Sequence, residues 1–393
     1  MTMRTHHNAT QKHALYALPD HEVVEVLLPR AVERHVAVEE AARLIRTYTG
    51  LVPLAIDPRG EGRVIWGDLG VHPFREWQYI FTIQHLAAQE SIGDAFSTPI
   101  DILDHEELFA DSLYPSGFIH HISRCGSTLT AKALARPNGH MMISQGGPLQ
   151  RGFWAHITKD WTRPAEPDEK TLRRLRTLVL AMTRPRCGDE HRAFVKFISW
   201  NVVYVDLIAA AFPDVPALFL YRDPVEVIAS VKRDTTAALL TRGTDQGAFL
   251  TGLPREKGAE LSDVDYLTAC YARYFEVVED AKCNLSLVNY RDLGPHSFTR
   301  VAEQGLDLCL KEDDRLAMLE QFRYHSKDDS NSSTFSDDRA AKQAALSEDE
   351  RARIEETCAD LIARLDHSKR NLFAKNAPFG GDDSQKTFAR QHQ

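Results

Sequence analysis

The sequence of 393 residues predicts an α/β protein: a three-layer sandwich in which helices cover both faces of a mainly parallel sheet, with a smaller N-terminal α/β appendage. Two observations predict this fold. From about residue 115, short apolar runs alternate with longer amphipathic segments. Two of these runs lead through a short polar turn directly into a helix, which is typical of the carboxyl edge of an open parallel sheet. We expect the appendage over residues 1–110, the sandwich over 111–375 and a disordered tail over 376–393.

The strands of the sandwich are expected at short runs rich in Val, Ile, Leu, Met and Phe. They cover residues 118–122, 141–143, 194–198, 217–221 and 285–288. Apolar residues at helical spacing predict intervening helices over residues 127–135, 168–182, 202–212 and 225–232. Ser347 and Glu350 form a capping box, which predicts a last helix that runs to about Leu365.

The appendage carries weaker patterns. Helical spacing of apolar residues predicts helices over 38–48 and 77–85, and the run 64–66 predicts a short strand. Two roles stay open for this segment: it packs as a cap on the sandwich, or it contributes to substrate specificity. Near the other end of the chain, the polar segment 325–342 is rich in Ser and Asp and is expected to be a flexible loop.

Composition excludes several classes of function. Lys and Arg total 47 and Asp and Glu total 56, so the net charge is −9, and we expect no nucleic acid or anionic membrane as partner. An anionic ligand must therefore be held by a local basic site. Six scattered cysteines indicate neither a disulfide framework nor a metal site. The N-terminus is polar and no run of about 18 apolar residues exists, so we expect a cytoplasmic protein without a membrane span.

The first strand-to-helix turn has the chemistry of a phosphate cradle. It reads Ser123-Arg124-Cys125-Gly126-Ser127-Thr128 and leads into the helix predicted over 127–135. A helix N-terminus presents unpaired N–H groups and the positive end of the helix dipole. Gly126 permits a tight turn, the two hydroxyl residues add donors, and Arg124 adds a planar cation that suits phosphate oxygens. The turn is no Walker A motif, because no Gly-Lys-Ser/Thr follows.

The second turn follows the run 217–221. Asp223 and Pro224 suit the N-cap and the first position of a helix. Arg222 stands at the carboxyl end of the strand, and Ser230 lies about two turns into the helix. A cation and a hydroxyl from neighbouring elements are able to grip one phosphate.

Together the two turns resemble the sulfotransferases that use 3′-phosphoadenosine 5′-phosphosulfate, above all the bacterial type with a Gly-Ser-Thr loop. The resemblance covers about residues 115–345 and implies the P-loop-like sulfotransferase fold, this phosphosulfate donor and no metal. It implies that Arg124 stands where the family has a Lys, and that the loop through Cys125, Gly126, Ser127 and Thr128 holds the 5′ end of the donor. Arg222 and Ser230 match the family's 3′-phosphate site.

Further parts of the family pattern are present. Lys196, within the run 194–198, resembles the Lys that reaches the bridging or sulfuryl oxygens, and a Lys among apolar residues is otherwise costly to bury. Tyr290-Arg291-Asp292-Leu293 resembles a structural Tyr-x-Asp-Leu segment. In relatives, the segment matching 325–342 closes over the 3′-phosphate and adenosine, which makes Lys327, Arg339 and Lys342 candidates there.

The general base departs from the family pattern. Ile198 stands where some relatives have a His, and Gln145 stands where others have a Glu. Gln145 is the residue expected at the base position beside the catalytic candidates Lys196 and Arg124, but an amide takes no proton at neutral pH. Asp223 is better explained as a helix cap. The remaining candidates for the base are all histidines: His120, His121, His140 and His156.

Cys125 has two interpretations. Beside a helix N-terminus and Arg124, its pKa is expected to fall and favour a reactive thiolate. The alternative is a small residue that replaces the family's Ser.

Three functions therefore stay open. The chain is a sulfotransferase that acts on a hydroxyl or an amine, or a relative that binds the nucleotide without catalysis, or a P-loop kinase-like phosphotransferase. The sequence identifies neither the acceptor nor the oligomeric state.

Overall fold

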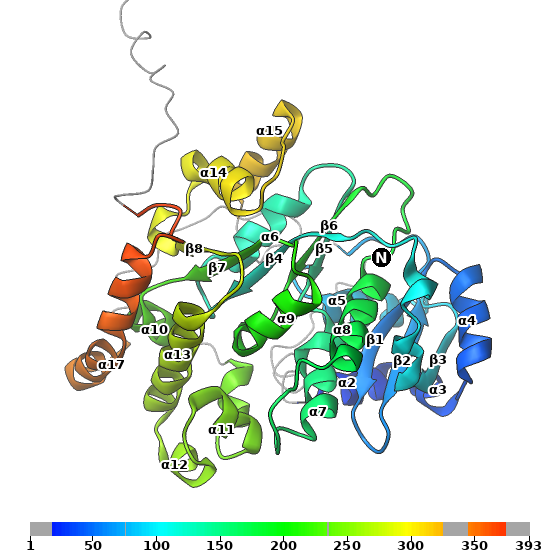
Figure 1. Ribbon diagram of the computed structural model, residues 1–393, viewed down its shortest axis with the longest axis horizontal. Coiled ribbons are helices and arrows are strands. Elements are labelled where there is room, and N and C mark those ends of the chain that lie inside the picture. Colours follow the sequence, from blue (N-terminus) through cyan, green and yellow to red (C-terminus); the bar gives the residue numbers. More distant parts are fainter. Residues whose placement is uncertain (1–17, 75, 234–235, 325–344, 375–393) are drawn as a thin grey trace, which may run out of the picture.

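The computed structural model describes residues 18–374 except 75, 234–235 and 325–344. Two sheets form the framework (Figure 1). The three-stranded antiparallel sheet has the order β1 (Leu51–Asp57), β2 (Arg63–Asp68), β3 (Ala95–Pro99). The five-stranded sheet is parallel and has the order β5 (His140–Ser144), β6 (Arg192–Lys196), β4 (Pro115–His121), β7 (Ala217–Tyr221), β8 (Leu285–Asn289).

The five predicted strands of the sandwich are all present. Nearly every residue in them is buried, as a parallel sheet covered on both faces requires. Most boundaries differ by one to three residues, and β6 ends at Lys196 instead of residue 198. Ile198 caps the short 3₁₀ helix η4 (Ser199–Tyr204), which takes the chain away from the sheet.

The helices confirm the predicted three layers. From β4 the chain moves two positions along the sheet to β5, and the connecting helix is α6 (Ser127–Ala135). All later connections run in the opposite direction, through α8 (Glu169–Met182), α9 (Val205–Ala211) and α13 (Asp263–Asp280). Because such crossovers are right-handed, the change of direction puts α6 on one face and the others on the opposite face, as Figure 1 shows.

The remaining elements complete the layers. On the α6 side lie α14 (Pro295–Gly305) and α15 (Glu312–Glu320), and at the β8 edge lie α10 (Pro224–Arg233) and α17 (Glu348–His367). The predicted capping box of α17 is confirmed, since Ser347 Oγ accepts from the Glu350 N–H at 3.2 Å. Other elements are α2 (Asp20–Leu27), α3 (Pro29–Glu33), α4 (Val38–Thr47), α5 (Tyr79–Ala88), α7 (Phe153–Thr158), α11 (Asp245–Thr251), α12 (Arg255–Glu260), η1 (Ile100–Asp104), η2 (Glu106–Phe109), η3 (Pro148–Gly152), η5 (Ala237–Thr241), η6 (Tyr290–Asp292) and η7 (Gln321–Arg323).

The N-terminal unit, residues 18–110, contains the predicted helices α4 and α5 and the predicted strand β2. Strands β1 and β3 were not expected from the sequence. β1 includes Pro53, which argues against an interior strand, but β1 is an edge strand, where a missing N–H costs no ladder bond. The Pro53 carbonyl instead accepts a hydrogen bond from Tyr79 Oη at 2.7 Å.

The N-terminal unit packs closely on the sandwich. The free edge of β1 lies against η3, and two glycines there leave no room for a side chain. A Cβ on Gly152 would lie 2.1 Å from the Ile56 carbonyl oxygen, and one on Gly147 would lie 2.6 Å from that of Leu54. A continuous set of buried apolar residues runs through both parts. The boundary near residue 110 stays a prediction.

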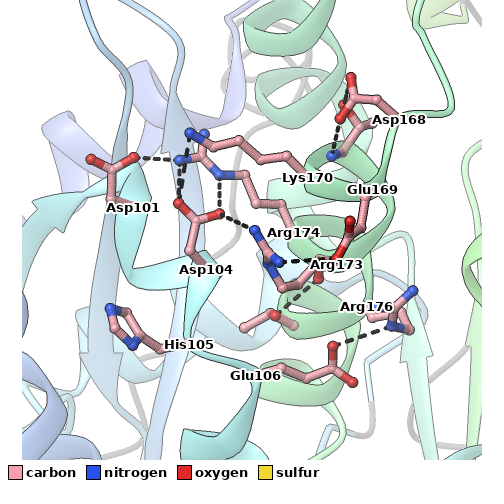
Figure 2. A network of polar contacts seen from close by, with 12 residues as sticks. Asp101, Asp104, His105, Glu106, Asp168, Glu169, Lys170, Arg173, Arg174 and Arg176 are labelled. Carbon is pink, nitrogen blue, oxygen red and sulfur yellow. Dashed lines mark hydrogen bonds and ion pairs between the residues drawn. The ribbon is translucent and has the colours of Figure 1, made fainter.

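Ion pairs join the two parts on the surface of α8 (Figure 2). Arg174 donates to both carboxylate oxygens of Asp104, at 2.8 and 2.7 Å, and also contacts Asp101. Its side chain is only 8% exposed, so loss of these partners would leave a buried charge. Burial raises the pKa of Asp104, but the hydrogen bonds and charge of Arg174 outweigh this effect and hold the pKa below its ordinary value.

We predict that Arg174→Met lowers the free energy of unfolding by about 2–3 kcal/mol at pH 7, because two carboxylates lose their cation. Lys170→Met, at an exposed position 3.8 Å from the same Asp104, should cost under about 1 kcal/mol. Urea denaturation measures both. The pKa of Asp104 is lowered in the folded state, so its contribution is lost as the pH falls through that value. The effect of Arg174→Met should therefore shrink below about pH 4, and an effect that grows there would contradict this account.

Candidate functional site

The predicted phosphate loop lies at the carboxyl end of β4, where it enters α6. Arg124 has a φ of +57° and Gly126 a φ of +82°, so the chain turns sharply before the helix. A Cβ on Gly126 would lie 2.8 Å from the Tyr290 ring, which explains the glycine. Gly126 is also the N-cap of α6 and has no side chain to cap the helix, so the N-terminal N–H groups of α6 suit an anion.

The second predicted turn meets the first. Arg222 follows β7, and its Nη1 lies 3.5 Å from the carbonyl oxygen of Arg124. β4 and β7 are neighbours whose connections leave in opposite directions. The crevice beyond their carboxyl ends is therefore the topological switch point, where open α/β sheets bind ligands. The fold thus brings together two turns that are 98 residues apart.

Arg222 is held on two sides. Its guanidinium carbon lies 4.3 Å from the centre of the Tyr290 ring, and the group forms a close ion pair with Glu226. The Arg222 side chain is 8% exposed and that of Glu226 is 22% exposed. Ser230, one turn beyond Glu226 on α10, is also buried. The spacing of four residues puts Glu226 and Ser230 on one face of the helix. Sequence reasoning missed Glu226, although its position four residues after Arg222 was a usable signal.

A cavity of about 400 Å³ opens beside Arg222. The turn after β8 and helix α17 form its other walls, with Tyr290 and Asp366 among the lining residues. Tyr290 was expected to be structural, but its ring lies under the cation at the centre of this site.

Lys196 lies at the carboxyl end of β6 and is fully buried. In the sheet register it stands opposite Ile119 of β4 and Ser144 of β5. Its charge is close enough to lower the pKa of His121. The candidate catalytic Lys therefore lies in the row of Ile119, four residues before the loop begins at Ser123.

Gln145 follows β5 in a left-handed conformation, with a φ of +54°. Its N–H donates to the Lys196 carbonyl oxygen at 2.7 Å. The side chain is buried, and its Oε1 has no hydrogen-bond partner among the described residues. A strained backbone and an unsatisfied buried amide both cost stability, and such features gather at functional sites.

Neither strand histidine is placed as a general base. Nδ1 and Nε2 of His121 lie 2.6 Å from the Ile122 carbonyl oxygen and 3.0 Å from that of Phe197. The His120 ring stacks on Phe197 with centroids 4.8 Å apart. Burial lowers the pKa of both residues to about 3, and the Lys196 charge adds to this for His121. His121 serves to join the ends of β4 and β6.

The other base candidates lie apart from the loop. His140 begins β5, so it stands at the amino edge of the sheet, opposite the two turns. His156 lies on α7 and lines a large cleft between the N-terminal unit and the sandwich. Asp223 accepts from the Val225 N–H at 2.9 Å, which confirms its predicted role as a helix cap. Lys327, Arg339 and Lys342 lie outside the described residues.

The expectation of a reactive thiolate at Cys125 is wrong. Cys125 is fully buried, with Sγ 2.9 Å from the Ile122 carbonyl oxygen and 3.2 Å from that of Leu220. Burial raises the pKa of its thiol to about 12, although Ser127 and Lys196 act in the opposite direction. The side chain points beneath the loop, where desolvation exceeds the effect of the helix dipole. Cys125 is a small packing residue.

Two absences hold for the part of the chain that the structure describes. Within it, no three His, Cys, Asp or Glu residues are grouped to hold a metal ion. None of its helices is long and apolar enough to cross a membrane.

Comparison with known proteins does not assign this chain to a family. No protein-family model matches the chain, and no curated protein gives a significant match. Solved structures similar to it include sulfotransferase STF9 from Mycobacterium avium, at 13% identity, 66% of this chain, 79% of that chain and a TM-score of 0.37. Another is sulfotransferase STF1 from Mycobacterium tuberculosis H37Rv, at 14% identity, 72% of this chain, 86% of that chain and the same TM-score. Likeness at this level assigns no family, so we base the proposed function on the residues of the site.

We predict that iodoacetamide at pH 8 modifies the exposed Cys187 and Cys309 in the native protein but leaves Cys125 unmodified. In urea all six cysteines should react. Peptide mass spectrometry after a short reaction measures each site. Native labelling of Cys125 as fast as that of Cys309 would show that the loop exposes its thiol.

Proposed function

We propose that the chain is a sulfotransferase that uses 3′-phosphoadenosine 5′-phosphosulfate. One observation carries this proposal: at the switch point between β4 and β7, the uncapped N-terminus of α6 and the cation of Arg222 converge, with Arg222 Nη1 3.5 Å from the Arg124 carbonyl oxygen. Two separate anion sites that meet in one crevice suit a nucleotide with phosphates at both ends of its ribose.

The residues fit such a donor. The turn at Gly126, with Ser127 and Thr128 at the start of α6, would hold the 5′-phosphate through N–H and O–H donors. Arg222, with Ser230 on the neighbouring helix, would hold the 3′-phosphate. In a chain of net charge −9, this local arrangement supplies the positive potential that the donor needs.

Glu226 sets a condition on donor binding. Its carboxylate forms an ion pair with Arg222. A 3′-phosphate must displace Glu226 from Arg222, and it then lies close to the negative charge of Glu226. Glu226 therefore orients Arg222 at some cost in affinity, and a dianion outcompetes it more readily than a monoanion.

The transfer step needs little covalent help from the protein. The acceptor oxygen or nitrogen forms a bond to sulfur, the bond between sulfur and the 5′-phosphate oxygen breaks, and its electron pair stays on that phosphate. Lys196 and the α6 N-terminus would stabilise the charge on the sulfuryl and leaving oxygens. Gln145 takes no proton, so the acceptor's proton would pass to another group or to solvent water.

A second candidate function is nucleotide binding without transfer, and Gln145 is the observation that favours it. A P-loop kinase is less well supported, because the loop 123–128 has neither a Gly-Lys-Ser/Thr sequence nor a carboxylate for magnesium. The same proposal includes a domain boundary near residue 110 and donor-binding roles for Lys327, Arg339 and Lys342.

We predict that Arg222→Met weakens binding of adenosine 3′,5′-bisphosphate about 30-fold, because a charge-assisted pair with the 3′-phosphate is lost. Binding of adenosine 5′-monophosphate, which lacks that phosphate, should change less than about threefold. Glu226→Gln should strengthen bisphosphate binding about three- to tenfold, since it removes a competing charge. Isothermal titration calorimetry measures all three. Equal losses for both nucleotides in Arg222→Met would remove the 3′-phosphate assignment.

We predict that Lys196→Met lowers the rate of sulfuryl transfer at least about 100-fold while bisphosphate affinity changes less than about threefold. A ³⁵S-labelled donor and a panel of phenols, sugars and amines measure transfer. If the unaltered protein binds the donor but transfers to no acceptor, the binding function replaces the catalytic one.

A further inference from the structure

A large cleft of about 1190 Å³ lies outside the proposed donor site. The N-terminal unit supplies one wall, through α2 and the turn between β1 and β2. The sandwich supplies the other, through α7, the start of α8 and α11. Neither part has this cleft by itself. The proposed donor site uses none of its residues.

Side-chain contacts connect the cleft to the phosphate loop. Arg151, at the cleft wall, has its guanidinium carbon 5.9 Å from the centre of the Trp200 ring. Trp200 follows Ser199, whose Oγ lies 3.5 Å from Ser123 Oγ in the loop. The Gln150 side chain, next to Arg151, donates to the Gln145 carbonyl oxygen at 3.2 Å. The inner end of the cleft thus lies against the segments that surround the proposed transfer centre.

Three cations of the cleft wall, Arg59, Lys170 and Arg174, pair with carboxylates outside it. Arg174 pairs with Asp101 and Asp104, as Figure 2 shows. Arg59 pairs with Asp57 at 2.8 Å and also with Glu25. These guanidinium groups have little charge left for a ligand.

The inner end carries an excess of negative charge. Asp20, Glu22 and Asp160 all interact with the single guanidinium of Arg151. Burial raises the pKa of Asp20 to about 7, with Arg151 acting in the opposite direction, so Asp20 is partly charged at neutral pH. At this end three carboxylates therefore interact with one guanidinium. Lys159 and Arg163 also line the cleft. This end of the cleft suits a cation.

A buried amide also points to a ligand. Gln246 of α11 lines the cleft and is 5% exposed, and its Nε2 has no hydrogen-bond partner among the described residues. An unsatisfied buried donor costs about 1–3 kcal/mol unless a ligand oxygen accepts from it. Thr241 and Thr244 line the same wall, and their hydroxyl groups donate to the Ala238 and Thr241 carbonyl oxygens. The unsatisfied donor of Gln246 therefore suits a ligand oxygen, such as that of a hydroxyl group.

The turn that carries Asp160 is fixed in place. Lys159, Asp160 and Trp161 are consecutive residues with φ of +48°, +55° and +60°. Trp161 Nε1 donates to Tyr204 Oη at 2.7 Å, and the Tyr204 ring stacks on Trp154. Asp160 therefore stands on a rigid wall, which favours selective binding.

We propose that this cleft is the acceptor site and that it takes a polyhydroxylated amine, an amino-sugar-like molecule whose ammonium group lies near Glu22 and Asp160. The inference rests on the proposed sulfotransferase function and gives it a substrate class. The donor enters from the crevice between β4 and β7, and the acceptor enters from the cleft.

Three glucose derivatives that differ in charge test the cleft. We expect 2-aminoethyl β-glucoside to bind about tenfold more tightly than ethyl β-glucoside, and glucuronate to bind more weakly than either. The double variant Glu22→Gln/Asp160→Asn should reduce this preference to under about twofold while binding of the neutral glucoside stays unchanged. Asn suits the left-handed turn, so the substitution preserves the backbone. Ligand-observed NMR and calorimetry at pH 7.5 measure the affinities.

A matched control is the double variant Glu40→Gln/Glu356→Gln, which removes two exposed carboxylates on α4 and α17 and should keep the preference. A second variant, Gln246→Leu, should weaken both glucosides without lowering the melting temperature, because it removes a donor that is unsatisfied without ligand. Equal binding of the charged and neutral glucosides, or a preference that survives Glu22→Gln/Asp160→Asn, would overturn the inference.

This experiment needs no donor, so its failure is distinct from failure of the proposed function. If the amine preference is absent while adenosine 3′,5′-bisphosphate still binds through Arg222, the acceptor inference falls and the donor site stands. If the amine preference is present, transfer of ³⁵S to the aminoethyl glucoside should depend on Glu22 and Asp160. Transfer that is unchanged by Glu22→Gln/Asp160→Asn and by Gln246→Leu would show that the acceptor binds elsewhere.

Discussion

The reversal of chain direction between β4 and β7 determines most of what this protein can do. Right-handed crossovers send α6 to one face of the sheet and α8, α9 and α13 to the other. At the point of reversal no helix covers the carboxyl ends of the two strands in the described part of the chain. The turns at Arg124 and Arg222 occupy this gap and contact each other. The topology alone therefore provides a place where an anion is able to bind, whichever residues stand there.

The proposed donor is a polyanion, which an acidic chain has to hold at a local site. The backbone N–H groups of α6 and Arg222, which is oriented by the Tyr290 ring and by Glu226, would do this with few full charges. Ion pairs also limit the free charge of the cleft wall, because carboxylates outside it neutralise Arg59 and Arg174. The sign of the charge on each surface depends on local ion pairs more than on the net charge of the chain.

Much of this arrangement could be predicted from the sequence, because the sandwich strands are short, apolar and bounded by turns. The two anion turns could be predicted because glycine, hydroxyl residues and Arg stand directly after strands. The environment of Cys125 could not be predicted, because a small change in the loop backbone decides where its thiol lies. The thiol either faces the helix N-terminus or is buried beneath the loop, as it is here. Strand β1 was hidden by Pro53, which only an edge strand tolerates.

The cleft could not be predicted because its two walls come from segments that are distant in the chain. Glu22 and Asp160 are ordinary surface residues in the sequence, and they acquire a common role only when β1 packs against Gly147 and Gly152. Without those glycines the backbones of β1 and η3 would separate and the cleft would widen. The packing of the N-terminal unit on the sandwich therefore forms the cleft itself, and under the proposed function selectivity for the acceptor would depend on that junction.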